Sequence, residues 1–189
     1  MQRLQQLSFI VCVLALSWFA IMAVHELGHV LGAVLTGGQV ERVVLHPLAI
    51  SRTDVSPNPS PAVVVWFGPL VGCLVPAAGC LLIPRRIAIA RNVASFFAGF
   101  CLIANGAYIS VDSLDRVGDC GEMIRSGSPF WTLPAFGAVT IPLGAFLWHR
   151  LGSPRQFLSD PTIIPPRFAW SALLILLLVV AGECAFSPR

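Results

Sequence analysis

The sequence predicts an all-α membrane protein with about five transmembrane helices and a short strand-like loop between the first helix and the second. Hydrophobic residues make up 56% of the 189 residues and charged residues only 11%, with a mean hydropathy of +0.81. A soluble domain has about 25% charged residues, so this chain lacks the polar side chains needed to face water on all sides. It also contains several apolar stretches long enough to cross a bilayer.

A helix that crosses the bilayer needs about 20 mostly apolar residues, because the hydrocarbon core is about 30 Å thick. The last stretch is the clearest, since Leu173 to Val180 is unbroken. The fourth is the weakest, since Pro134 and Pro142 interrupt it, although such kinks are tolerated where neighbouring groups bond the freed carbonyls. The expected spans are residues 7–35, 62–83, 87 or 92 to 109, 130–148 and 168–186.

The first apolar stretch follows Arg3 and superficially resembles a secretory signal. It continues to Leu35, far beyond the roughly 7–15 apolar residues of such a signal. We therefore expect it to remain as a transmembrane helix. The sequence as a whole predicts one multi-pass membrane domain over residues 1–189, integral to the cell (plasma) membrane.

The distribution of charges and cysteines does not favour a nucleic-acid partner or a zinc site made of cysteines. The net charge of +3 comes entirely from scattered arginines, whereas a nucleic-acid binding protein needs a basic face or stripe. We expect a lipid bilayer around the chain and no nucleic acid. The six cysteines include no Cys-x-x-Cys pair, so the pattern does not predict a thiolate zinc site, and cysteines in apolar stretches usually behave as small hydrophobic residues.

A short segment between the first two expected helices has a different character. Gly37 and Gly38 end the first helix, and residues 40–50 are rich in β-branched side chains, with Pro47 as a break. This composition predicts two short strands at the membrane surface. Residues 56–61 alternate proline with serine or asparagine and form a loop.

The strongest chemical signal is His25-Glu26-Leu27-Gly28-His29 in the first expected helix. Residues four apart lie on the same helix face, so His25 and His29 can both reach one metal ion. Glu26 lies about 100° further round the helix and can take a proton from a water beside the metal without ligating the metal. This is the His-Glu-x-x-His arrangement of zinc metalloproteases, in which the glutamate is the general base.

The position of this motif inside a membrane span makes a chance match a poor explanation. A charged side chain at the centre of a span costs roughly 2.5–3.5 kcal/mol on insertion scales, and a bound divalent cation compensates such a cluster. Zinc hydrolases add a third protein ligand and leave a fourth position open. If the spans alternate in direction, the end of the first helix and the end of the third emerge on the same side. The candidates for the third ligand are Asp112, Asp115, Asp119, Glu122 and His46.

With these residues in place, the chain resembles the site-2 protease (M50) family of intramembrane zinc metalloproteases, as a minimal or divergent M50B-like member. The resemblance covers about residues 8–128, followed by two further helices at about 130–148 and 168–186. In that family the third ligand is the aspartate of an Asp-Gly-Gly motif, which Asp119-Cys120-Gly121 resembles. The resemblance therefore implies Asp119 as the third ligand, with Asp112 or Asp115 as alternatives. It also implies Zn²⁺ as cofactor and a strand-docking loop at residues 39–51.

Two departures from the family pattern concern asparagine. Family members often have Ala-Gly-Pro-x-x-Asn in the second helix, where this chain has Phe67-Gly68-Pro69-Leu70-Val71-Gly72. The usual Asn-x-x-Pro element is missing, and Asn105 lies 14 residues before Asp119. The resemblance implies a zinc-dependent endopeptidase that cleaves a transmembrane or juxtamembrane segment of a membrane-protein substrate. The alternative is a non-catalytic membrane scaffold that binds or regulates a partner.

Overall fold

The computed structural model describes residues 2–84, 86–153, 159–160 and 164–187. Five of its helices are long and apolar enough to cross a membrane, which confirms the predicted all-α membrane class. A two-stranded sheet lies between the first helix and the second, also as predicted. The long helices are α1 (Gln2–Leu35), α2 (Pro61–Leu82), α3 (Ala88–Asp115), α5 (Thr132–His149) and α7 (Pro166–Phe186).

The helices differ from the expected spans mainly at one end of α3. This helix continues to Asp115 and so includes the first part of a polar stretch that covers residues 110–129. It ends where Arg116 adopts a left-handed conformation, with φ of 55°. A short helix, α4 (Gly118–Arg125), follows directly. The remaining polar residues are therefore turned back towards the bundle.

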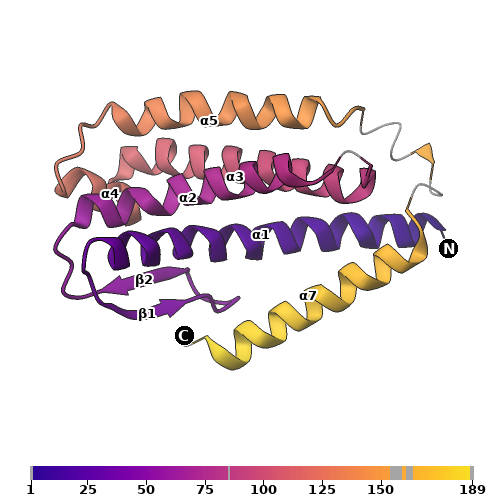
Figure 1. Ribbon diagram of the computed structural model, residues 1–189, viewed down its shortest axis with the longest axis horizontal. Coiled ribbons are helices and arrows are strands. Elements are labelled where there is room, and N and C mark those ends of the chain that lie inside the picture. The colour runs from indigo at the N-terminus through magenta and orange to yellow at the C-terminus, as the bar shows by residue number, and fades with distance from the viewer. Residues whose placement is uncertain (1, 85, 154–158, 161–163, 188–189) are drawn as a thin grey trace.

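The long helices run roughly along one axis, and the sheet, α4 and the carboxyl end of α1 gather at the same end of the bundle (Figure 1). Glycines bring α3 and α5 together: a Cβ at Gly144 would lie 2.6 Å from the carbonyl oxygen of Gly99. Further along the same pair, Trp148 donates from its indole to the carbonyl of Phe96 at 2.9 Å. Small residues allow such close approach between membrane helices.

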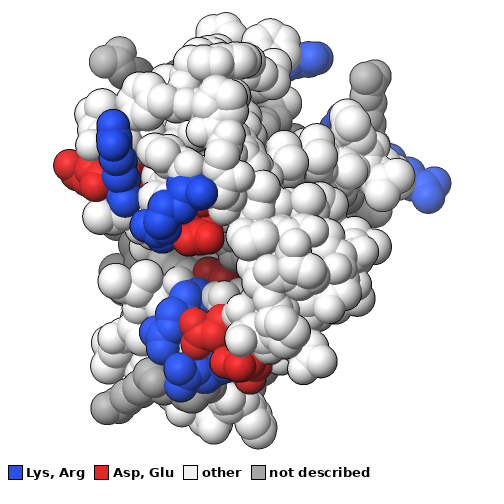
Figure 2. All heavy atoms as spheres, turned by 90° about the vertical axis from the view of Figure 1, so that its left-hand side faces the viewer, with Lys and Arg blue, Asp and Glu red and all other residues white. Residues whose placement is uncertain are grey.

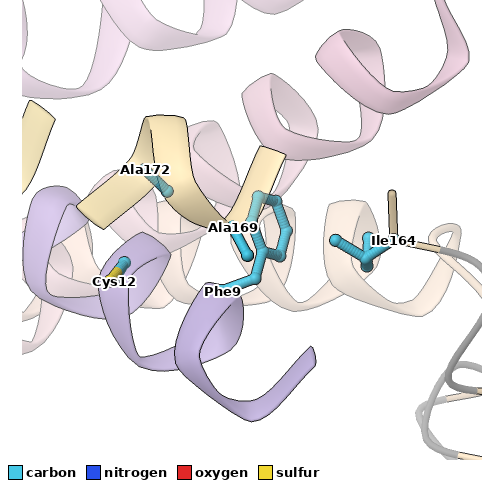
Figure 3. Packing of buried hydrophobic residues seen from close by; sticks show 5 residues of the cluster. All are labelled: Phe9, Cys12, Ile164, Ala169 and Ala172. Atoms are coloured by element: carbon cyan, nitrogen blue, oxygen red, sulfur yellow. The ribbon is translucent and has the colours of Figure 1, made fainter. Parts of the chain in front are cut away.

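The last helix, α7, runs obliquely towards the sheet from the opposite end of the bundle, where it begins beside the start of α1 (Figure 1). Figure 3 shows the packing there, with side chains from both helices meeting beside Ile164. The buried residues are Phe9 and Cys12 of α1 and Ala169 and Ala172 of α7. This contact joins the last helix to the amino-terminal half of α1, away from His25.

The sheet consists of β1 (Val40–Val44) and β2 (Arg52–Val55), which pair antiparallel. The second strand therefore lies after residue 51, and the expectation that both strands fall within residues 40–50 is wrong. The reason is local, because His46 begins a turn. Its carbonyl accepts from the backbone N–H of Ala49 at 3.0 Å and its Nδ1 from that of Leu48 at 3.1 Å.

The short helix α4 is fixed by a buried apolar cluster. Cys120 and Met123 on its inner face are fully buried and pack against residues of α2, α3 and α5. Those partners are Val65, Ile109 and Leu133. The packing leaves the first turn of α4, with Asp119, directed towards α1.

Candidate metal centre

Three side chains from distant parts of the sequence meet at one point. Asp119 Oδ2 lies 2.8 Å from His25 Nε2 and 3.4 Å from His29 Nε2. Among the described residues, these three form a group whose ligand atoms all lie within 4.8 Å of one another. The two histidines come from successive turns of α1 and the carboxylate from the start of α4, so two turns of helix and one helix end define the centre.

The other nitrogen of each imidazole is already bonded. His25 Nδ1 lies 2.8 Å from Asn105 Oδ1, and His29 Nδ1 lies 2.9 Å from the carbonyl oxygen of Val64. The amide of Asn105 donates from Nδ2 to the carbonyl of Cys101, which fixes its oxygen towards His25. Because both partners can only accept, each Nδ1 carries the hydrogen, and each neutral ring presents the lone pair of Nε2 to the centre.

This donor set fits a divalent metal ion. Two nitrogen lone pairs and a carboxylate oxygen converge with no hydrogen of their own between them, an arrangement that suits a bound cation. Ligand atoms around tetrahedral zinc at about 2.0–2.1 Å lie about 3.3 Å apart, close to the separation of His29 and Asp119. The backbone makes room as well, since a Cβ at Gly68 would overlap Nε2 of His29 and lie 2.9 Å from that of His25.

The ionisation of the α4 side chains supports the same set of ligands. Burial raises the pKa of Asp119, but the contacts with the imidazoles of His25 and His29 outweigh it and hold that pKa well below its usual range. Asp119 is therefore an anionic carboxylate near neutral pH. Burial and the nearby carboxylate of Asp112 raise the pKa of Cys120 to about 12. Its thiol points to the carbonyl of Ile109 at 3.3 Å, so the neighbouring cysteine is not a thiolate ligand.

The other candidates for the third ligand lie elsewhere. Asp112 and Asp115 are near the end of α3, and neither lines the cavity that contains His25 and His29. Glu122 lines the cavity but pairs with Arg125 at 2.8 Å. His46 is buried in the turn between the strands. Of the five candidates named from the sequence, the structure brings only Asp119 to the two histidines.

Glu26 is beside this group and almost fully buried, with 3% of its surface exposed. Its carboxylate oxygen Oε2 accepts a hydrogen bond of 2.7 Å from the hydroxyl of Thr53 in β2. The same cavity contains Glu26 and all three members of the metal-binding group, and its volume is about 880 Å³. The sheet thus contacts the carboxylate that the sequence motif marks as the general base.

The cavity meets the surface at the end of the bundle that carries the sheet and α4. Figure 2 shows acidic and arginine side chains grouped on both sides of a hollow there. On the sheet, Asp54 pairs with Arg42 at 3.1 Å and Arg52 at 3.4 Å. The rest of that face is largely uncharged.

Three contributors to the centre were not identified from the sequence. Gly68 provides the space beside the imidazoles, Asn105 orients His25, and Thr53 bonds Glu26. The sequence offers a reason to notice two of them. Gly68 belongs to a glycine-proline pair, and Asn105 is a polar residue within an apolar helix. Asn105 also occupies the space left by Gly72, where a Cβ would lie 2.8 Å from its Nδ2.

The contact between Asn105 and His25 gives a first prediction. Replacing Asn105 with leucine keeps the side-chain size but removes the acceptor that holds Nδ1, and loss of such a partner typically lowers metal affinity about 10–100-fold. We expect a fall of that size in zinc affinity, measured by competition with a chelator. Asn92→Leu is the matched control, because Asn92 is on the same helix but lines a different cavity. An equal loss in both variants would contradict this role of Asn105.

A comparison with known protein families gives a match over the amino-terminal part of the chain. The family described as Peptidase M50B-like matches residues 7–110, more than half of the 189-residue chain. The protein therefore belongs to the site-2 protease (M50) family of membrane peptidases. The matched segment includes the motif of α1 and most of α3 but ends before Asp119. The comparisons with curated proteins and with solved structures give no match.

Proposed function

We propose that the protein is a zinc-dependent intramembrane endopeptidase, with His25, His29 and Asp119 as metal ligands and Glu26 as general base. The convergence of two Nε2 atoms and one carboxylate oxygen beside a buried glutamate is the observation that supports this best. A scaffold that only binds a partner has no need of a buried general base. We further propose that the active unit lies within residues 8–128 and that the protein resides in the cell membrane.

The chemistry needs few groups. Zinc, when bound, lowers the pKa of a water towards about 7 and polarises the scissile carbonyl. Glu26 then accepts a proton from the attacking water and later delivers it to the leaving nitrogen. Because Thr53 holds Oε2, the other carboxylate oxygen is left for this proton transfer. Asn105 and the carbonyl of Val64 keep both imidazoles in the tautomer that a metal requires.

The proposed substrate is a transmembrane or juxtamembrane segment that unwinds near the site, because an amide within a helix is shielded from attack. Residues 52–55 of β2 line the cavity, so an extended segment can add along this strand through backbone hydrogen bonds. The side of the cavity within the bundle is apolar, with Trp18, Ile21 and Met22 of α1. These residues suit the apolar part of a substrate that remains in the bilayer.

Purified wild-type protein and Glu26→Gln, compared for zinc content and for cleavage of a reporter transmembrane protein, test this proposal. We expect both to bind about one zinc ion, with cleavage by Glu26→Gln reduced about 10²–10⁴-fold, the usual contribution of a general base. Glu41→Gln is the matched control, since Glu41 lines the mouth of the same cavity but is exposed. Equal cleavage by wild type and Glu26→Gln would contradict the role of Glu26, and no cleavage by zinc-loaded wild type would support the scaffold instead.

The Thr53 contact gives a second prediction. Replacing Thr53 with valine keeps the shape and the strand preference but removes the donor to Glu26. A hydrogen bond to a charged group contributes about 1.5–3 kcal/mol, so kcat should fall about 10–100-fold while zinc content stays unchanged. Thr53→Ser keeps the hydroxyl and should retain activity within about threefold of wild type. Loss of activity in the serine variant as well would show that the hydroxyl is not what matters.

A further inference from the structure

Tyr108 is the only tyrosine in the chain, and it lines the same cavity as Glu26 and the candidate ligands. It follows Asn105 by three residues on α3, so the two side chains project from the same face of that helix. Its ring meets the ring of His25 edge-on, with 5.9 Å between the centroids. The metal-binding group and the general base leave this phenol without a role.

The phenol oxygen is held by the backbone at the start of α4. It accepts a hydrogen bond of 3.3 Å from the N–H of Asp119. The preceding residue, Gly118, has a φ of 52°, and a Cβ there would lie 2.7 Å from the phenol oxygen. Glycine is therefore needed both for the turn and for this approach, which fixes the tyrosine oxygen beside the residue that carries the candidate carboxylate ligand.

The phenol hydrogen has no recorded partner in the part of the chain that the structure describes. Among the residues that the structure describes, no acceptor for the Tyr108 hydroxyl is found, although a phenol can donate as well as accept. Glu26 is held from β2 and Tyr108 from α4, which lie on different sides of α1 (Figure 1). The carboxylate of Glu26 therefore lies on one side of the cavity, and the hydroxyl of Tyr108, which can donate a hydrogen bond, lies on another.

We propose that Tyr108 is a further catalytic residue, whose phenol donates a hydrogen bond to the oxygen of the scissile carbonyl as negative charge develops there. This inference rests on the proposed peptidase function. A fixed donor aimed at a developing oxyanion is among the largest single contributions to catalysis. The backbone contact at Asp119 fixes the phenol in advance, so the donor need not reorganise during the reaction.

The step balances without any further reactant. The water oxygen forms a bond to the carbonyl carbon, one water proton passes to Glu26, and the π electrons of the carbonyl move onto its oxygen. Tyr108 stabilises this oxygen and keeps its own proton. When the carbon–nitrogen bond breaks, its electron pair leaves with the nitrogen, which takes the proton from Glu26. The electron pair on the oxygen then restores the carbonyl. The products are a carboxylic acid and an amine.

Tyr108→Phe tests the proposal by separating kcat from KM. Removal of one oxyanion donor typically lowers kcat about 10²–10³-fold, and we expect this loss with KM and zinc affinity within about twofold of wild type. If Tyr108 only supports α4 through the Asp119 N–H, zinc affinity will fall instead, and kcat of the zinc-saturated variant will stay near that of wild type. That result overturns the proposal. An inactive wild type would refute the peptidase function itself, which keeps the two failures distinct.

A second measurement applies even if Tyr108→Phe does not fold. Because the chain has one tyrosine, biosynthetic replacement of tyrosine by 3-fluorotyrosine labels Tyr108 alone in the full-length protein. Its fluorine NMR signal should shift when a phosphinic peptide binds, since the tetrahedral anion of that probe resembles the charged carbonyl oxygen. The matching amide peptide, added to labelled Glu26→Gln protein, should shift it less. Equal shifts, or none with the phosphinic peptide, would overturn the proposal.

Discussion

Replacing Gly68 with alanine is expected to abolish metal binding while the helix bundle still forms. The added methyl group would overlap Cε1 and Nε2 of His29 and lie 2.9 Å from Nε2 of His25. These atoms belong to side chains, so the rings can turn aside, but they then no longer face Asp119. Loss of a single supporting contact costs about 10–100-fold in metal affinity, and displacement of two ligands should exceed that. Zinc content after dialysis and thermal stability in detergent measure the two effects.

Gly79→Ala is the matched control for Gly68→Ala, because both glycines are on α2 and a Cβ at Gly79 meets nothing within 4 Å. This variant should bind zinc as wild type does. Wild-type zinc affinity in Gly68→Ala would show that the imidazoles do not use the space beside this glycine. The centre would then have to be located elsewhere.

The second large effect is expected at Gly28, one residue before His29. A Cβ there would overlap the carbonyl oxygen of Phe67 and lie 2.7 Å from Cα of Gly68. Both contacts are to backbone, so α1 and α2 must separate for the methyl group to fit. Overpacking costs typically about 1–3 kcal/mol and occasionally more, and here we expect the upper end. Thermal unfolding in detergent should show a marked loss of stability, accompanied by loss of zinc.

Gly182→Ala provides the comparison for Gly28→Ala, since a Cβ at Gly182 of α7 meets nothing within 4 Å. Its stability should stay near that of wild type or rise slightly, because alanine is the better helix former by about 1 kcal/mol. Equal melting temperatures for the two variants would mean that α1 and α2 are not in backbone contact. The small residues of the motif would then have no packing role.

Much of the architecture follows from one physical requirement, the length of apolar helix that a bilayer demands. That requirement predicted five spans, and alternation of their direction predicted that the end of α3 returns to the side of His29. The same argument does not select Asp119 as the third ligand, because Asp112 and Asp115 satisfy it equally well. Asp112 and Asp115 lie near the end of α3, whereas Asp119 lies in the first turn of α4. The burial of Cys120 and Met123 fixes α4 in this place, and the sequence of this polar stretch does not predict that burial.

The contacts around the imidazoles lay beyond sequence reasoning for a different reason. Gly72 interrupts the family pattern, yet Asn105 reaches into the space it leaves and bonds His25 from α3. The family pattern places an asparagine at the position of Gly72 in α2. Here the asparagine comes from α3, so inspection of the α2 sequence does not reveal it. The second strand was displaced for a comparable reason, because a turn at His46 uses the residues expected to form it. Thr53 reaches Glu26 only because β2 begins after that turn.

The most direct measurement is X-ray absorption at the zinc edge of the purified protein, together with zinc content per chain. We predict about one zinc ion per chain with only nitrogen and oxygen neighbours at about 2.0–2.2 Å, and loss of the ion in Asp119→Ala. Cys120→Ala, which removes the adjacent buried thiol, should leave the spectrum unchanged. A sulfur neighbour near 2.3 Å, or zinc retained after both histidines and Asp119 are replaced by alanine, would contradict a centre built from two imidazoles and one carboxylate.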